Sequence, residues 1–325
     1  MSGLTDQTSN TESSDLDIRY QRENNFARYY KRLKKSDTIF ALFLIAPALL
    51  VITVVVLYPL TRSIVLSFQS YDLTSPATQG QWVGFKHYIN LFNNELYRKS
   101  WGNAMVWGIG TVLGQFIVGF SFAILLNQAI KFQNWFRGIY LLPWVLPPIA
   151  AALLWWWIFD LSHGVLNLTL KQFGLITEYV PWISNPDYAI YSVILAAIWR
   201  WFPFDMVMLL AGLQTVDSEI LDAAAVDGAN RIQQFIHVVL PHMRNIIIVV
   251  LLLTTVWSFQ EFTLIWGITK GGPVYATRTL NLFIYQTAFD FFRMGEAAAA
   301  GVVWLIFLLI FAIIVIKFGL KDFEI

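Results

Sequence analysis

Long apolar runs, separated by short polar segments, make up most of the chain after residue 37. A helix needs about 20 apolar residues to cross the hydrocarbon core of a bilayer, so runs of this length predict membrane-spanning helices. Six such spans are predicted, at residues 38–68, 101–127, 138–159, 187–213, 246–268 and 295–317. The pattern therefore predicts an all-α, polytopic membrane protein with six transmembrane helices.

Three of the predicted spans have features that bear on their geometry. The first, residues 38–68, is longer than one crossing requires, which indicates a tilted or projecting helix. The second contains Gly110 and Gly114, and this spacing of small residues lets a neighbouring helix pack closely. The third contains three prolines, which a membrane helix accommodates when neighbouring groups bond the freed carbonyls.

A polar segment, residues 214–244, separates the fourth predicted span from the fifth. Its sequence predicts two short helices with a break between them. Asp217 or Ser218 can cap the N-terminus of the first helix by accepting a hydrogen bond from its backbone. The alanines that follow favour helix, and Gly228 stands where a helix ends in the left-handed conformation.

The second helix of this segment begins at Asn230, whose side chain can cap it, with Gln233 in capping-box spacing. It is predicted to be amphipathic, because its apolar side chains recur at the spacing of one helical face. These side chains are Ile232, Phe235, Ile236, Val239 and Leu240. Pro241 then predicts a boundary before the next apolar run.

Composition supports a membrane protein, and the distribution of charge gives its orientation. Hydrophobic residues make up 57% of the chain and charged residues 13%, against about 45–50% and about 25% in soluble domains. Residues 19–35 are basic and lie next to the first span, so the positive-inside rule places them in the cytoplasm. Six spans then put both termini and the segment 214–244 on the cytoplasmic side.

Residues 1–37 are predicted to form a cytoplasmic tail that precedes a transmembrane domain of residues 38–325. The first part of the tail is rich in serine, threonine and aspartate, a composition typical of disorder. The second part interleaves aromatic with basic residues, as in a helix that lies along an anionic membrane surface. A basic stretch can also bind nucleic acid. Next to a membrane span, however, basic residues more often serve to orient the span, so no nucleic-acid partner is predicted.

The sequence D-A-A-A-V-D-G-A at residues 222–229, followed by Phe235 and a Leu-Pro pair at 240–241, resembles the cytoplasmic coupling loop of ABC importer permeases, the EAA loop. Two positions depart from that pattern. Asp222 replaces the usual glutamate, which keeps the charge but shortens its reach, and Asn245 stands where a proline is common. The resemblance implies that the loop docks on an ATPase subunit. The residues it assigns to ATPase coupling are Glu219, Asp222, Ala223, Ala224, Asp227, Gly228, Phe235 and Pro241.

Further motifs resemble the sugar-transporter branch of these permeases. They are L-L-P-W-V-L-P-P at 141–148, G-V-L-N at 164–167, P-F at 203–204, A-G-L-Q at 211–214 and T-K-G-G-P at 269–273, with Thr277 and Thr279 after it. Together they resemble a maltose-type permease with the type I importer fold, over nearly everything after the tail. The resemblance implies a permease subunit of an ATP-driven, binding-protein-dependent importer, which works by alternating access in a bacterial-type cytoplasmic (inner) membrane.

The resemblance also implies the partners of the chain. They are a second permease of a different chain, two ABC ATPase subunits, an extracytoplasmic solute-binding protein, membrane lipid and a sugar-like solute. The chain has no G-x-x-x-x-G-K-[ST] motif, so ATP and Mg are expected on the ATPases and the chain itself is not expected to be an enzyme. Cysteine is absent and the four histidines are dispersed, so no metal site and no cofactor are predicted.

Polar residues within the fifth predicted span form the candidate solute site. Polar side chains at membrane depth are costly unless they face a cavity or a partner, and a hydroxyl-rich solute needs hydrogen-bonding groups and an aromatic face. In a continuous helix, positions 257, 260, 261 and 264 share one face. The predicted substrate-pathway residues are Trp257, Ser258, Gln260, Glu261 and Asp205. The alternative is that Gln260 and Glu261 only bond to neighbouring helices.

The resemblance leaves the solute open among sugars, sugar acids, polyols and glycerol phosphates, and leaves open whether its site lies in this chain or in the partner permease. The alternative function is a secondary transporter, or another integral membrane protein not coupled to ATPases. Such transporters tend to show inverted repeats and buried titratable side chains. Arg200, Asp205 and Glu261 are candidates for buried charges, although Arg200 and Asp205 can instead pair or reach the outer interface. No convincing internal repeat is found, which favours the importer.

Overall fold

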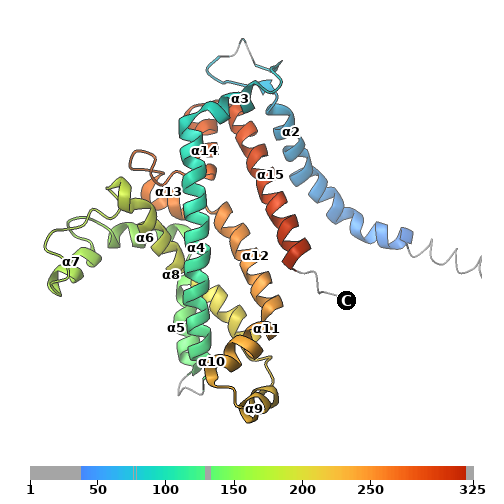
Figure 1. The fold of residues 1–325 in the computed structure, drawn as a ribbon. Coiled ribbons are helices and arrows are strands. Elements are labelled where there is room, and N and C mark those ends of the chain that lie inside the picture. Colours follow the sequence, from blue (N-terminus) through green and yellow to red (C-terminus); the bar gives the residue numbers. More distant parts are fainter. Residues whose placement is uncertain (1–37, 76, 78, 129–132, 320–325) are drawn as a thin grey trace, which may run out of the picture. The chain divides into compact units, whose positions relative to one another are not determined.

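The computed structural model of the protein describes residues 38–319, except 76, 78 and 129–132. Its elements are helices, apart from a short antiparallel ribbon of β1 (Gln69–Ser70) and β2 (Gln81–Trp82) (Figure 1). The predicted cytoplasmic tail lies outside the described residues. The prediction of a helical membrane protein is confirmed, and the ribbon is an addition that the sequence did not indicate.

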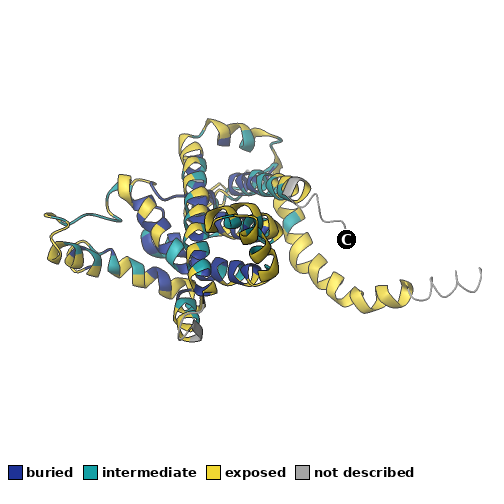
Figure 2. Ribbon diagram, turned by 60° about the horizontal axis from the view of Figure 1, so that its bottom comes forward, coloured by how far each residue is buried: buried dark blue, intermediate teal, exposed yellow. Residues whose placement is uncertain are grey.

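The chain divides into two compact units after Arg62. The described part of the first unit belongs to one helix, Thr38–Leu66, which matches the first predicted span. This helix passes through a π-helical turn, η1 (Thr53–Leu57), into α2 (Tyr58–Leu66). Residues 38–59 are all exposed (Figure 2).

The second unit contains the remaining elements. The earlier ones are α3 (Lys86–Asn93), α4 (Glu95–Asn127), α5 (Gln133–Val145), α6 (Pro148–Ile158), α7 (Val165–Gln172) and α8 (Pro186–Leu213). The next are α9 (Ser218–Val226), α10 (Arg231–Gln234), the π-helical turn η3 (Phe235–Val239), α11 (Leu240–His242) and α12 (Arg244–Gln260). The last are α13 (Thr263–Thr269), α14 (Leu280–Tyr285), the π-helical turn η4 (Gln286–Asp290) and α15 (Met294–Gly319). Within this unit α3 lies at one end and α9 at the other, with α4 running between them (Figure 1).

Four helices of the described residues are long and apolar enough to cross a membrane, and up to six spans result if two bent pairs each count as one. The unbroken helices are Thr38–Leu66, Glu95–Asn127, Pro186–Leu213 and Met294–Lys317. The bent pairs are Trp135–Val145 with Pro148–Ile158, at 93°, and Arg231–His242 with Arg244–Gln260, at 67°. Each predicted span therefore has a counterpart, but not every counterpart is one straight helix.

The third and fifth predicted spans are broken in the structure, so the prediction of continuous helices there is wrong. The helix of the third span breaks before Pro148, because two consecutive prolines lack the N–H groups that would continue it. In the fifth span, α12 ends at Gln260 and α13 begins at Thr263. Between them Glu261 is extended, with φ −62° and ψ 129°.

Small residues let α4 pack closely along α8, which is its most extensive partner. A Cβ added at Gly110 would lie 3.0 Å from Cδ1 of Ile194, and one at Gly114 would collide with the side chain of Ile198. The close approach predicted from the glycine spacing is therefore confirmed. It extends to Gly119, where an added Cβ would lie 2.9 Å from the backbone oxygen of Phe202.

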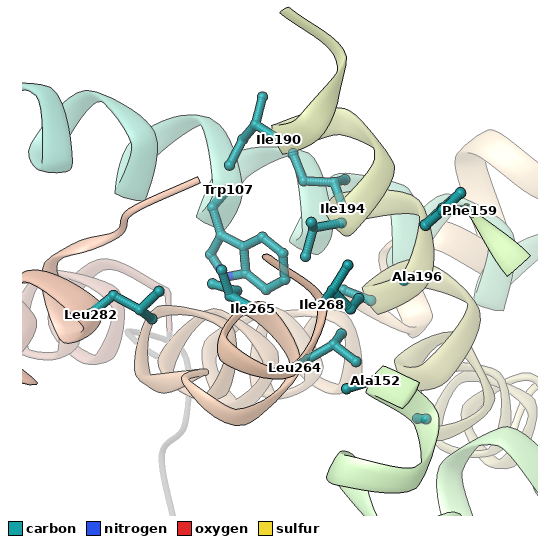
Figure 3. Close-up of a cluster of buried hydrophobic side chains, with 13 residues drawn as sticks. Trp107, Ala152, Phe159, Ile190, Ile194, Ala196, Leu264, Ile265, Ile268 and Leu282 are labelled. Atoms are coloured by element: carbon teal, nitrogen blue, oxygen red, sulfur yellow. The ribbon is translucent and has the colours of Figure 1, made fainter. Parts of the chain in front are cut away.

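Buried side chains concentrate along α8, the most enclosed of the unbroken spans (Figure 2). One core cluster joins α8 to α4, α6 and α13, and in it the ring of Trp107 lies close to Ile265 (Figure 3). A second cluster includes Leu280 and Phe283 of α14 and residues of α15. A third joins the end of α8 to the segment after α10 and contains Met243, which is fully buried.

Replacing Gly119 with alanine is expected to destabilise the protein by about 1–3 kcal/mol, the usual range for overpacking. The added methyl group would meet backbone atoms of α8, which cannot rotate away as a side-chain tip can. Thermal unfolding of the purified protein measures the effect. Gly102→Ala on the same helix is the matched control, because a Cβ there meets nothing within 4 Å. Equal unfolding temperatures for the two variants would contradict this account of the α4–α8 contact.

Candidate functional site

The first helix of the polar segment forms as the sequence predicts. Asp217 is its N-cap, and Oδ1 accepts a hydrogen bond from the backbone N of Glu219 at 2.9 Å. After α9 the chain reverses at Gly228, which has φ +88°. Backbone bonds from Gly228 to Ala225 and from Ala229 to Ala224 close the helix end. A residue with a side chain at position 228 would be strained in this left-handed conformation.

The second helix begins with the predicted capping box. Oδ1 of Asn230 accepts from the backbone N of Gln233 at 2.9 Å, and Oε1 of Gln233 accepts from the backbone N of Asn230 at 2.8 Å. The predicted apolar face is only partly correct. Val239 belongs to the third core cluster, and Phe235 packs against it. Ile232, in contrast, is 70% exposed, and Ile236 is also exposed. The π-helical turn η3 begins at Phe235, so the regular helical period that the sequence prediction assumes does not continue through Ile236 and Val239.

Exposed acidic and apolar side chains share the surface of α9, which has no buried residue. The acidic ones are Glu219, Asp222 and, directly after the helix, Asp227. The apolar ones are Ile220 and Val226, and Val226 is 88% exposed. Leu221 anchors the helix by packing on the third core cluster. Ala223, Ala224 and Pro241 belong to the same polar segment, so the structure gathers all eight predicted coupling residues in one region, at the end of the unit opposite α3 (Figure 1). Sequence reasoning missed Ile220 and Val226, which the resemblance does not single out.

A small, narrow pocket of about 10 Å³ lies where α4, α8 and α12 meet. Its lining residues are Gln115, Trp201, Phe204, Thr254, Trp257 and Ser258. The ring of Trp257 packs edge-on to that of Phe204 with 4.9 Å between the centroids, and lies 6.0 Å from that of Trp201. Aromatic faces thus stand beside one amide and two hydroxyl groups, a combination suited to a hydroxyl-rich ligand.

The structure brings only part of the predicted solute site to this pocket. Trp257 and Ser258 line it. Gln260 lies at the end of α12 and is exposed, and no hydrogen bond of its side chain is found among the described residues. Glu261 lies beyond the end of α12, so the prediction that it shares a helical face with Trp257 and Gln260 is wrong. Its Oε1 instead accepts from the backbone N of Leu264 at 2.9 Å, which caps α13.

Two buried charged residues on α8 lie beside this site. Arg200 is 4% exposed, and its guanidinium lies over the ring of Trp201. Its Nη2 donates to the backbone oxygen of Leu146, at the α5–α6 break, over 3.1 Å. Asp205 is fully buried, and neither of its carboxyl oxygens has a hydrogen-bond partner among the described residues. The two residues form no ion pair in the part of the chain that the structure describes, and Asp205 does not line the pocket but packs against Gly119.

Sequence reasoning missed Gln115, Trp201, Phe204 and Thr254 as lining residues. The aromatic cluster in the fourth span, W-R-W-F-P-F at 199–204, was the available signal. The sequence alone does not show which of these aromatic residues face the pocket, because that depends on which side of α8 packs against α12. No group of three or more histidine, aspartate or glutamate side chains among the described residues is arranged to hold a metal ion.

Comparisons with known proteins extend these observations. Residues 115–322 match the family model described as binding-protein-dependent transport system inner membrane component. The chain is 32% identical over 281 residues to the sulfoquinovosyl glycerol transport system permease protein SmoG of Agrobacterium fabrum, covering 86% of this chain and 90% of that protein. It is 28% identical over 291 residues to the trehalose/maltose transport system permease protein MalF of Thermococcus litoralis, covering 89% and 96%.

The fold is also that of a solved permease. A chain from the crystal structure of a bacterial ABC transporter involved in the import of the polysaccharide alginate superposes with a TM-score of 0.76. The match covers 91% of this chain and 100% of that chain at 22% identity. Because the family model covers most of the chain and SmoG exceeds 30% identity over most of its length, this chain belongs to the family of inner membrane components of binding-protein-dependent transport systems, the permeases of ABC importers.

Proposed function

We propose that this permease carries a sugar or sugar-like solute, and that the pocket between α4, α8 and α12 is part of the solute's path. The observation that carries the proposal is the grouping of Trp201, Phe204 and Trp257 around polar side chains at membrane depth. Relatives named for the transport of sulfoquinovosyl glycerol and of trehalose and maltose support this class of solute.

The residues that line the pocket form one wall of a larger cavity. Ligand sites usually enclose about 300–1,000 Å³, whereas the pocket in this chain has a volume of only about 10 Å³. A second permease, a different chain in our proposal, supplies the other wall. An extracytoplasmic solute-binding protein delivers the solute to the outer side, as in the structure of the alginate transporter with its periplasmic protein.

The polar segment, residues 214–244, transmits the movement of the ATPase subunits to the membrane-spanning helices. In the proposed assembly two ABC ATPases bind ATP and Mg, and the present chain provides transport without a catalytic site of its own. The exposed carboxylates and apolar side chains of α9 dock on one ATPase. Both termini lie in the cytoplasm, on the same side as α9, in agreement with the positive-inside rule.

Packing connects the docking surface to the pocket. Met243, at the 67° bend between the polar segment and α12, is fully buried against residues of α8, including Met206 and Leu209. A displacement of α9 therefore moves α8 and α12 together with the side chains that they contribute to the pocket. This gives alternating access a physical route, because packed elements shift as units rather than deform gradually.

An ion-driven secondary transporter is the second candidate, and Asp205 is the observation that favours it. An unpaired carboxyl group at membrane depth is the kind of group that proton-coupled transporters use. The packing of Asp205 against Gly119, away from the pocket, argues against this role. Uptake into vesicles that hold this chain without ATPases, driven by a pH gradient and abolished by Asp205→Asn, would favour the second candidate instead.

Asp222→Lys is expected to reduce ATP-dependent uptake by more than about tenfold, since like or misplaced charges at an interface cost several kcal/mol. The measurement is uptake into proteoliposomes that contain the purified complex, together with recovery of the ATPase subunits during purification. Gln128→Lys is the control, because Gln128 is exposed at the end of α4 and outside the polar segment. Normal uptake by the Asp222→Lys complex would remove α9 from the coupling mechanism.

Trp257→Leu is expected to reduce the stimulation of ATP hydrolysis by solute-loaded binding protein by about tenfold, the equivalent of one aromatic contact of about 1.4 kcal/mol. The solute is first chosen by screening neutral disaccharides, hexuronates, polyols and glycerol phosphates for stimulation of the unmodified complex. Trp156→Leu is the matched control, because Trp156 is 48% exposed on α6 and does not line the pocket. Equal loss in both variants, or none in Trp257→Leu, would contradict the proposed path.

A further inference from the structure

The end of α12 leaves carbonyl groups that no later turn of the helix can bond. Side chains from other elements bond those of Ser258 and Phe259, and the Ser258 oxygen also accepts from the backbone N of Glu261. Nε1 of Trp107 on α4 donates to the backbone oxygen of Ser258 over 2.8 Å. Nδ2 of Asn281 on α14 donates to the backbone oxygens of Phe259, over 2.8 Å, and of Glu261, over 3.2 Å.

Both donors are held in place by packing. Trp107 is 2% exposed, and its ring lies in the first core cluster near Ile265 (Figure 3). Asn281 stands between Leu280 and Leu282, which are both fully buried. The donors therefore approach the end of α12 from fixed directions, and they fix the orientation of the carbonyls that they bond.

The two bonds of Asn281 lie on either side of the point where the helix stops. Phe259 is still part of α12, whereas Glu261 is already extended. Free rotation at this point would turn the last helical turn, which carries Trp257 and Ser258 into the pocket. One amide that bonds both carbonyls prevents that rotation.

We propose that Asn281, together with Trp107, is a positioning residue that sets the orientation of the last turn of α12 and so the placement of Trp257 and Ser258 for the solute. The inference rests on the proposed function of the pocket. It assigns to α14, which contributes no lining residue, a role in transport through α12.

A single cysteine introduced by Ser258→Cys reports directly on the last turn. The chain has no cysteine of its own, and Ser258 is 6% exposed, so the Ser258→Cys variant should react slowly with N-ethylmaleimide in the assembled complex. Adding Asn281→Leu keeps the size of the side chain at position 281 but removes the amide that donates both hydrogen bonds. It is expected to increase the reaction rate about tenfold, which corresponds to about 1.4 kcal/mol for the two lost hydrogen bonds. Asn281→Gln, which retains the amide on a longer arm, should recover part of the difference.

Asn103→Leu is the matched control, because Nδ2 of Asn103 also bonds two carbonyls, those of Tyr275 and Arg278, away from the break. It should leave the reaction rate of the Ser258→Cys thiol within about twofold, since sites without shared partners act independently. An equal increase in both variants would show a general loss of stability, and no increase in Asn281→Leu would show that the bonds do not hold the turn. Either result overturns the inference.

A double-mutant cycle then tests whether Asn281 acts through Trp257. If it does, the loss of stimulation of ATP hydrolysis by binding protein in the complex with both Asn281→Leu and Trp257→Leu should be smaller than the product of the two single losses. Multiplying effects would overturn the positioning role while leaving the pocket intact. If Asn281→Leu reduces stimulation but Trp257→Leu does not, the proposed pocket is refuted instead. Failure of the positioning role and failure of the pocket therefore give different results.

Discussion

Backbone carbonyl groups at membrane depth need hydrogen-bond partners, because no water is available to them there. The fold interrupts its helices between α5 and α6 and again between α12 and α13, and each interruption frees such groups. At the first break Arg200 bonds the oxygen of Leu146, and at the second Asn281 bonds those of Phe259 and Glu261. Side-chain hydrogen bonds therefore stabilise both breaks, and the pocket lies beside the second one.

The helix α8 connects these features to the polar segment. Near its middle it carries Arg200, and one turn further Phe204 faces the pocket. Its end packs through Leu213 into the cluster that holds Met243 at the start of α12. The glycines of α4 allow this helix to lie close enough to enclose the pocket. In the proposed mechanism, in which packed helices move as units, α8 is the connecting element.

Local sequence signals predicted the polar segment well, because caps and a left-handed glycine depend on neighbours within a few residues. Asp217, Gly228 and the Asn230–Gln233 pair all stand as predicted. The geometry of the candidate solute site was predicted less well. Trp257 and Ser258 line the pocket, but a continuous helical period placed Glu261 on the same face, and the helix ends one residue earlier. That end is held by Asn281, which is distant in sequence and has no local signal.

The same limit applies to the buried charges and to the spans. Hydropathy located every span, yet it did not show that the third is bent by 93°, because the bend depends on how proline-freed groups find partners in space. Asp205 and Arg200 are close enough in sequence to suggest an ion pair, but Asp205 packs against α4 at Gly119 while Arg200 bonds the α5–α6 break. Whether two such side chains pair depends on how the helix is rotated about its axis relative to its neighbours, and the hydrophobic periodicity of the sequence does not determine that rotation.

We propose that the pocket between α4, α8 and α12 opens to opposite sides of the membrane as the ATPase subunits bind and hydrolyse ATP. Thr254→Cys, which introduces the only cysteine in the chain, places a reactive group in the pocket. Its modification by a membrane-impermeant thiol reagent, added to either side of proteoliposomes that hold the complete complex, measures access directly. The account predicts reaction from the cytoplasmic side without nucleotide and from the outer side when ATP is trapped with vanadate. Reaction from the same side in both states, or from neither side in either state, would contradict it.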